Sequence, residues 1–189
     1  MRCIIFPTEV VSVVEGKHIF VSIIAAIIST LIFIPFVFIV MGNINNLVRE
    51  IVIVQLKSQN VPQDVINATL TQIEGTLKFI IPITPIAQIL QASVLGAIMG
   101  LLYSYLITRR RLKPAISALI TGMSYILIFY VIPMVFLLET QAAILNVIFK
   151  YIWWPLTIAP YITYTVILIL FSVIKGPWNK WAEAKPSKY

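Results

Sequence analysis

The sequence predicts an all-α integral membrane protein with four transmembrane helices and additional amphipathic surface helices. Of its 189 residues, 60% are hydrophobic and only 11% are charged, whereas an ordinary soluble domain has about 25% charged residues. The mean hydropathy is +0.97. Four apolar stretches contain no Asp, Glu, Lys, Arg or His, and each reaches the roughly 20 residues that a helix needs to cross a bilayer. We therefore treat residues 1–189 as a single membrane domain.

The four predicted spans cover residues of about 19–41, 79–108, 114–138 and 151–174. The first exceeds the 7–15 apolar residues of a cleavable signal peptide, and no small-x-small cleavage site follows it. We interpret it as a retained signal-anchor helix. The shorter apolar run at 144–149 contains Asn146 and is interpreted as a surface helix that leads into the fourth span.

The distribution of lysine and arginine predicts the orientation of the spans. With four spans, the N-terminal segment, the 109–113 loop and the C-terminal tail share one side, which carries ten of the 14 basic residues. The segments 42–78 and 139–150 carry the other four, balanced by four acids. Because cytoplasmic loops are enriched in Lys and Arg, we expect a protein of the cell membrane with both termini in the cytoplasm.

The segments outside the spans are expected to be amphipathic. Residues 1–18 form an inner interfacial segment, and 175–189 form a basic cytoplasmic tail. Residues 43–78 are predicted to form two outer helices, because Ile66, Leu70, Ile73 and Leu77 fall on one helical face. These helices would lie on the outer leaflet; capping the bundle and docking a partner are the alternatives.

Small residues recur at helical spacing in the second and third spans, as Ala92, Gly96, Gly100 and Ser104 and as Ala118 and Gly122. Such residues let helix backbones approach closely in lipid. Because only residues 109–113 join these two spans, we expect them to form the tightest helix pair. Gly100 and Gly122 would then meet at the same depth.

A weak polar stripe in the third span consists of Ser117, Thr121 and Ser124, and Gln88 lies in the second span. These four are candidate lining residues of a pore or pocket, although serine and threonine also pair within their own helix. Gln88 and Gln91 are expensive to bury in lipid and should face protein or water. Prolines gather in the outer halves of the spans and are expected to kink the helices, which would open an outward-facing cavity.

The basic cluster Arg109, Arg110, Arg111 and Lys113 is first a topology anchor. It is also a candidate contact for anionic lipid headgroups, at about 1 kcal/mol per charge. Nucleic acid is not an expected partner, because the inner basic residues are spread over three short segments. The expected partners are the bilayer itself and other membrane subunits or further copies of the chain.

The sequence lacks the groups that membrane enzymes place in their spans. One cysteine, Cys3, and one histidine, His18, exclude an intramolecular disulfide and any multi-histidine metal site. We expect no catalytic residue, cofactor or metal. The leading interpretation is a non-catalytic accessory or scaffold subunit of a membrane complex or homo-oligomer. The alternatives are a small oligomeric channel or facilitator and, with less support, a membrane enzyme.

Overall fold

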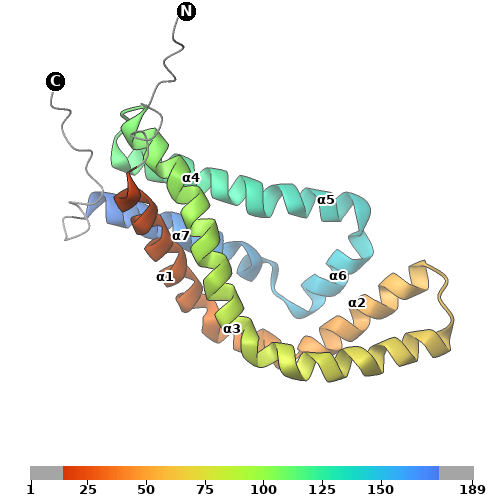
Figure 1. The fold of residues 1–189 in the computed structure, drawn as a ribbon. Coiled ribbons are helices and arrows are strands. Elements are labelled where there is room, and N and C mark those ends of the chain that lie inside the picture. The colour runs from red at the N-terminus through yellow and green to blue at the C-terminus, as the bar shows by residue number, and fades with distance from the viewer. Residues whose placement is uncertain (1–14, 175–189) are drawn as a thin grey trace, which may run out of the picture.

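The computed structural model describes residues 15–174, and every regular element in that range is helical. The predicted interfacial segment, apart from residues 15–18, and the predicted basic tail lie outside the described residues. The elements are α1 (Gly16–Met41), α2 (Ile44–Ser58), α3 (Gln63–Thr108), α4 (Pro114–Ile126), the π-helical segment η2 (Leu127–Val131), α5 (Ile132–Thr140), α6 (Ala142–Tyr151) and α7 (Trp154–Val173). Figure 1 shows their arrangement.

Four helices are long and apolar enough to cross a membrane: 16–41, 63–108, 114–140 and 154–173. This confirms the all-α class and the number of candidate spans. The fourth begins at Trp154 rather than at 151, because Ile152 has an extended backbone that separates α6 from α7. The separate helix α6 confirms the short surface helix that was expected before the fourth span.

The predicted boundary between an outer helix and a span at residue 79 is wrong. Residues 63–108 form one continuous helix of 46 residues, about 69 Å long at 1.5 Å per residue. Pro82 and Pro85 lie inside it, because a proline can stay in a helix that bends at the lost hydrogen bond. Figure 1 shows α3 changing direction between its N-terminal (yellow) and C-terminal (green) parts.

The small residues of α3 pack against α1, not against the third span. A Cβ atom on Gly96 would lie 2.9 Å from the Ile23 Cα atom and from the Ala26 Cβ atom. On Gly100 it would lie 2.7 Å from the Ile19 Cα atom. Ala92 and Ser104 are buried on the same face. The predicted partner was therefore wrong, because Ile19–Ala26 presents a backbone lined by small side chains that fits this stripe better.

The small residues of α4 pack against α7. A Cβ atom on Gly122 would clash with the side chain of Thr165, and Ala118 is fully buried in the core that also contains Leu168. The expected meeting of Gly100 with Gly122 does not occur. A short loop fixes the direction of the next helix, but it leaves the choice of the packed face to the side chains.

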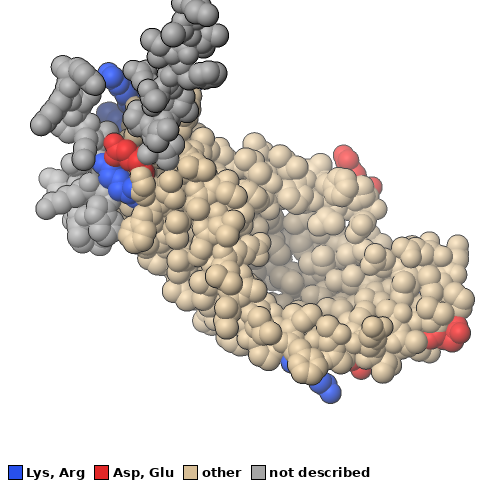
Figure 2. All heavy atoms as spheres, viewed as in Figure 1, with Lys and Arg blue, Asp and Glu red and all other residues tan. Residues whose placement is uncertain are grey.

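The two ends of the molecule differ in character. We call the end with residues 109–113 the basic end and the end with α2, residues 63–78 and α6 the arm end. Arg109 and its basic neighbours are exposed at the basic end. In Figure 2 most of the blue atoms lie at that end, whereas red atoms lie at both ends. Figure 2 also shows a hollow between α5 and the α2–α3 hairpin.

The predicted apolar face of the outer segment is real but is covered by the chain itself. Ile66 and Leu70 are buried, and Ile73 and Leu77 are half-buried. Leu47 of α2 and Leu145 of α6 are buried as well, where α2 packs against α3 and α6. The segment therefore forms a helical hairpin with its own small core.

A polar contact joins α2 to α6 at the arm end. The Lys150 ammonium donates to Glu50 Oε1 at 2.6 Å, and the Tyr151 hydroxyl donates to the same oxygen at 3.0 Å. These groups lie outside the apolar segments. The two donors lower the pKa of Glu50, first through the hydrogen bond from Lys150. The same hydrogen bond raises the pKa of Lys150.

Candidate functional site

The basic-end half of the bundle is closed by buried hydroxyl groups. Ser22 on α1 lies 2.7 Å from the Gly96 carbonyl, to which it donates, and 2.7 Å from the Tyr164 hydroxyl. Ser29 donates to the Pro160 carbonyl at 2.7 Å. These bonds tie α1 to α3 and α7.

His18 belongs to the same closed half, which the sequence did not indicate. Its side chain is fully buried, Nδ1 lies 3.4 Å from Ser104 Oγ, and the ring meets Tyr103 edge-on at 5.8 Å. Ser104 Oγ also accepts the Glu15 backbone N–H at 2.9 Å. A serine that was expected only to allow close packing therefore caps α1 as well.

The polar stripe of the third span faces the inside of the bundle. Ser117 and Thr121 are fully buried, and Ser124 is half-buried. Among residues 15–174, Ser117 Oγ, Thr121 Oγ1 and the Tyr103 hydroxyl have no hydrogen-bond partner. The two cavities described next are lined by Gln88 but not by these stripe residues.

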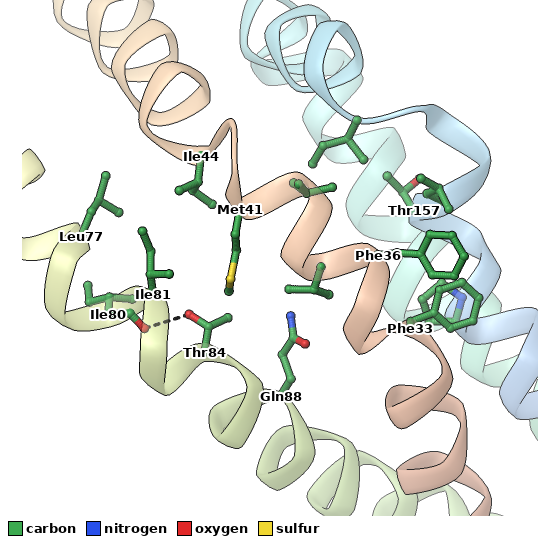
Figure 3. A pocket seen from close by; sticks show the side chains of 15 residues that line it. Phe33, Phe36, Met41, Ile44, Leu77, Ile80, Ile81, Thr84, Gln88 and Thr157 are labelled. Carbon is green, nitrogen blue, oxygen red and sulfur yellow. Dashed lines mark hydrogen bonds between the residues drawn. The ribbon is translucent and has the colours of Figure 1, made fainter.

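An apolar cavity of about 320 Å³ opens between α1, α3 and the start of α7. Figure 3 shows Phe33, Phe36 and Met41 of α1 on one side and Leu77 and Ile81 of α3 on the other. Thr84 also lines the cavity, but its hydroxyl is already bonded to the Ile80 carbonyl at 3.0 Å. The Gln88 amide points into this space from α3.

A second cavity of about 230 Å³ adjoins the first and has a more polar wall. The two share Phe33, Val37, Gln88, Thr157 and Pro160. The second adds polar side chains, namely Thr30, Gln91, Tyr125 and Tyr161. Together the two spaces form one site, which we call the arm-side cavity, with an apolar part and a polar part.

Several polar groups of the arm-side cavity have no hydrogen-bond partner within the described residues. Thr157 Oγ1 donates to the Trp154 carbonyl and lies 3.0 Å from the Tyr130 hydroxyl, so it is satisfied. In contrast, the amides of Gln88 and Gln91 and the hydroxyls of Tyr125 and Tyr161 form no hydrogen bond within residues 15–174. These four side chains are available to a bound molecule.

The tyrosines of the polar part are held in place by ring contacts. Tyr125 packs against Tyr161 at 5.1 Å, against Tyr164 at 4.7 Å and against Phe129 at 5.4 Å between ring centroids. Tyr130 packs against Tyr161 at 5.7 Å. Aromatic pairs at such distances are favourable beyond their buried area, so α4 and α7 present these hydroxyls on a rigid wall.

Several prolines lie in the helices around the arm-side cavity. Pro82 and Pro85 lie in α3 and Pro160 lies in α7, while η2 directly precedes Pro133. Each removes a backbone hydrogen bond, and π-helical turns and prolines are the usual causes of helix kinks. This agrees with the hypothesis that clustered prolines separate the helices at one end.

The basic cluster is arranged as a surface loop. Arg109, Arg110, Arg111 and Lys113 are exposed, and Arg111 has a positive φ of 52°. The Arg110 guanidinium lies 6.0 Å from the centre of the Tyr105 ring. Within residues 15–174, no three His, Cys, Asp or Glu side chains lie together in a way that would hold a metal ion.

No protein-family model, no curated protein and no solved structure matches this chain.

Proposed function

We propose that this chain is a non-catalytic, multi-pass protein of the cell membrane that acts as a structural subunit of a membrane assembly. Four helices of spanning length support the membrane location. Large apolar side chains are exposed on them, including Phe79 at 76% and Leu90 at 63%. Such surfaces are unfavourable in water and suit a lipid environment.

The proposed orientation places the basic end and both termini in the cytoplasm. Arg109, Arg110, Arg111 and Lys113 are exposed at that end, which fits the excess of positive charge on cytoplasmic loops. The same loop is the proposed contact for anionic lipid headgroups. The α2–α3 hairpin and α6 then lie on the outer side.

The observation that carries the subunit proposal is the exposed amide of Gln91. It lies on α3 about 18 Å along the helix from Phe79, at bilayer depth, and has no hydrogen-bond partner within residues 15–174. Gln91 also lines the polar part of the arm-side cavity, and an amide without a hydrogen-bond partner inside a membrane is costly. An amide both donates and accepts, so the same face of a second copy satisfies it.

The surroundings of Gln91 support a helix–helix contact. A shallow groove on α3 contains Gln91 together with Ile80, Ile83, Thr84, Ala87 and Gln88. The small Ala87 lets another helix approach closely, and glutamine pairs across helices stabilise association in membranes. We therefore propose a second copy of this chain as the partner at this face.

The channel alternative receives less support than the subunit proposal. Its candidate lining residues are Gln88, Ser117, Thr121 and Ser124. Ser117 and Thr121 are fully buried inside a single chain, and Ser124 is half-buried. The hydroxyl groups of Ser117 and Thr121 therefore cannot line a pore along an axis between several copies of the chain. Gln88 faces the arm-side cavity, which lies within one chain as well.

Self-association in liposomes tests the proposal, with single-molecule photobleaching as the measurement. We expect wild-type chains to form dimers and Gln91→Leu to weaken the dimer about fivefold or more, because one interhelical amide pair contributes about 1–2 kcal/mol. Gln72→Leu is the matched control, since Gln72 is an exposed glutamine on α3 outside the groove.

Three results would contradict parts of this proposal. A monomeric wild-type chain, or equal effects of Gln91→Leu and Gln72→Leu, would contradict the self-contact. Capture of a different membrane protein that Gln91→Leu abolishes would replace the second copy by that partner. Solute flux through liposomes that contain only this chain would contradict the structural role.

A further inference from the structure

We propose that the arm-side cavity binds an uncharged amphiphile, with its hydrocarbon chain in the apolar part and a hydroxyl or carbonyl head beside Gln88. The head would meet Gln88, Tyr125 and Tyr161. Because Gln88 and Gln91 line both the groove of the subunit proposal and the second cavity, the Gln91→Leu variant serves to tell the two proposals apart.

The apolar part fits a hydrocarbon chain. Its walls come from Phe33, Phe36 and Val40 of α1, Ile81 of α3 and Leu156 of α7. Its volume of about 320 Å³ is within the common range of about 300–1,000 Å³ for ligand pockets, which are mostly apolar with a few placed polar groups. Filling the space with a chain restores the contacts that its walls lack.

The polar part fits a small hydrogen-bonding head. Gln88 belongs to both cavities and points into the first from the α3 side. The Tyr125 and Tyr161 hydroxyls lie on the wall of the second cavity without partners in residues 15–174. A polar group without a hydrogen bond inside a membrane is costly, and a hydroxyl or carbonyl oxygen at this point supplies the missing bonds.

The absence of charge in the walls decides the class of ligand. No Asp, Glu, Lys, Arg or His lines either cavity. A carboxylate or phosphate taken to this depth would lose its hydration without gaining a counter-charge, which is strongly unfavourable. An uncharged head loses far less, so the site selects a neutral amphiphile over a fatty acid or a phospholipid headgroup.

Photolabelling of the purified chain in phosphatidylcholine nanodiscs tests this inference. Three probes carry the same diazirine-bearing dodecyl chain: a primary alcohol, the alkane without a head and the carboxylate. Labelled residues are located by mass spectrometry. We expect the alcohol to label residues 33–41 and 77–88 about fivefold more than either other probe, as one hydrogen bond in a desolvated site predicts.

Variants distinguish binding of the probes at the arm-side cavity from their general partitioning into lipid. Gln88→Leu should reduce alcohol labelling to the alkane level, and Val37→Phe should fill the shared wall and reduce labelling by both. Gln72→Leu should change nothing. Thermal unfolding shows whether Val37→Phe remains folded, and Gln88→Leu decides the matter if it does not.

Three outcomes would overturn the inference. Equal labelling by the alcohol and the alkane would mean that the head is not recognised. Labels spread over lipid-facing residues such as Leu90 and Val94, unchanged by Gln88→Leu, would mean nonspecific partitioning. In a separate experiment with a bifunctional cross-linker, cross-links from residues 33–41 to a second chain would place a copy of the protein in the cavity. A loss of dimers in Gln91→Leu with labelling retained would show that ligand binding and self-association are independent of each other.

Discussion

The position of a Cβ atom on Gly100 lies 2.7 Å from the Ile19 Cα atom, closer than side chains approach a backbone. The two helices α1 and α3 are in contact through their main chains at this level, and the neighbouring Gly96 repeats the relationship with Ile23. The atoms nearest to these two Cβ positions are backbone atoms or the Cβ atoms of Ser22 and Ala26. None of them is the movable end of a flexible side chain.

Gly100→Ala should therefore lower the free energy of unfolding by about 1–3 kcal/mol, because added volume in a packed interface forces the backbones apart. Gly75→Ala is the matched control. A Cβ atom there meets nothing within 4 Å, so helix propensity should raise stability by about 0.5–1 kcal/mol. Denaturant unfolding in detergent micelles measures both. Equal effects would contradict the main-chain contact.

Ser22 and Thr121 should respond in opposite ways to removal of the hydroxyl. Ser22 bonds the Gly96 carbonyl and pairs with the Tyr164 hydroxyl, so Ser22→Ala should destabilise by about 1–2 kcal/mol. Thr121 Oγ1 has no partner within residues 15–174, so the nearly isosteric Thr121→Val should raise stability by about 1 kcal/mol. The same unfolding experiment tests both. A destabilised Thr121→Val would instead indicate a hydrogen-bonded water at this hydroxyl.

The contact between Glu50 and Lys150 should hold the arms together over a defined pH range. The folded-state pKa of Glu50 is lowered from 4.5, so its contribution is complete above that value and is lost as pH falls through the lowered pKa. The pKa of Lys150 is raised from 10.5, so its contribution is lost only as pH rises through the raised pKa.

Spin labels on α2 and α6 measure this behaviour as a distance distribution. We expect a constant distance at neutral pH and a broader one in acid, and Glu50→Gln should show the broad distribution at every pH. A distance that stays constant in acid would mean that the apolar packing of Leu47 and Leu145, both buried, suffices to join the arms.

The proposed orientation predicts which single cysteines a membrane-impermeant thiol reagent reaches from outside intact cells. In a Cys3→Ser background, which removes the single native cysteine, Ser58→Cys should be labelled and Arg110→Cys should not. Both positions are exposed, so accessibility within the chain does not explain a difference. Labelling of Arg110→Cys alone would invert the topology.

The periodic features of the sequence predicted much of the fold. Uncharged apolar runs located the four long helices, and the spacing of Ile66 and Leu70 identified a face that is indeed buried. The sequence missed the continuity of α3 through Lys78, because a charged residue marks an end of an apolar run and not an end of a helix. The apolar face of residues 63–78 is buried at Ile66 and Leu70, and this packing continues the helix although the Thr, Asn and Asp residues of the segment have low helix propensity.

Relationships between distant residues could not be predicted in the same way. The choice of α1 as the partner of Gly96 depends on the shape of both helices, and small-residue spacing marks only one of them. Glu50 and Lys150 are 100 residues apart, and no local pattern connects them. The sequence indicated Gln88 because a glutamine side chain is costly to bury in lipid. The cavity that it faces could not be predicted, because four separate segments of the chain form it.

The pairing of helices imposes an order on assembly during synthesis. The pair α1–α3 is complete once residue 108 has left the ribosome, because the partners of Gly96 and Gly100 lie upstream in α1. Helix α4 follows directly but finds its main partner only in α7, where Thr165 meets Gly122. A nascent chain that ends before α7 thus leaves one face of α4 uncovered. Ser117 and Thr121, which are fully buried in the complete fold, also belong to α4 and would meet the machinery that assists insertion.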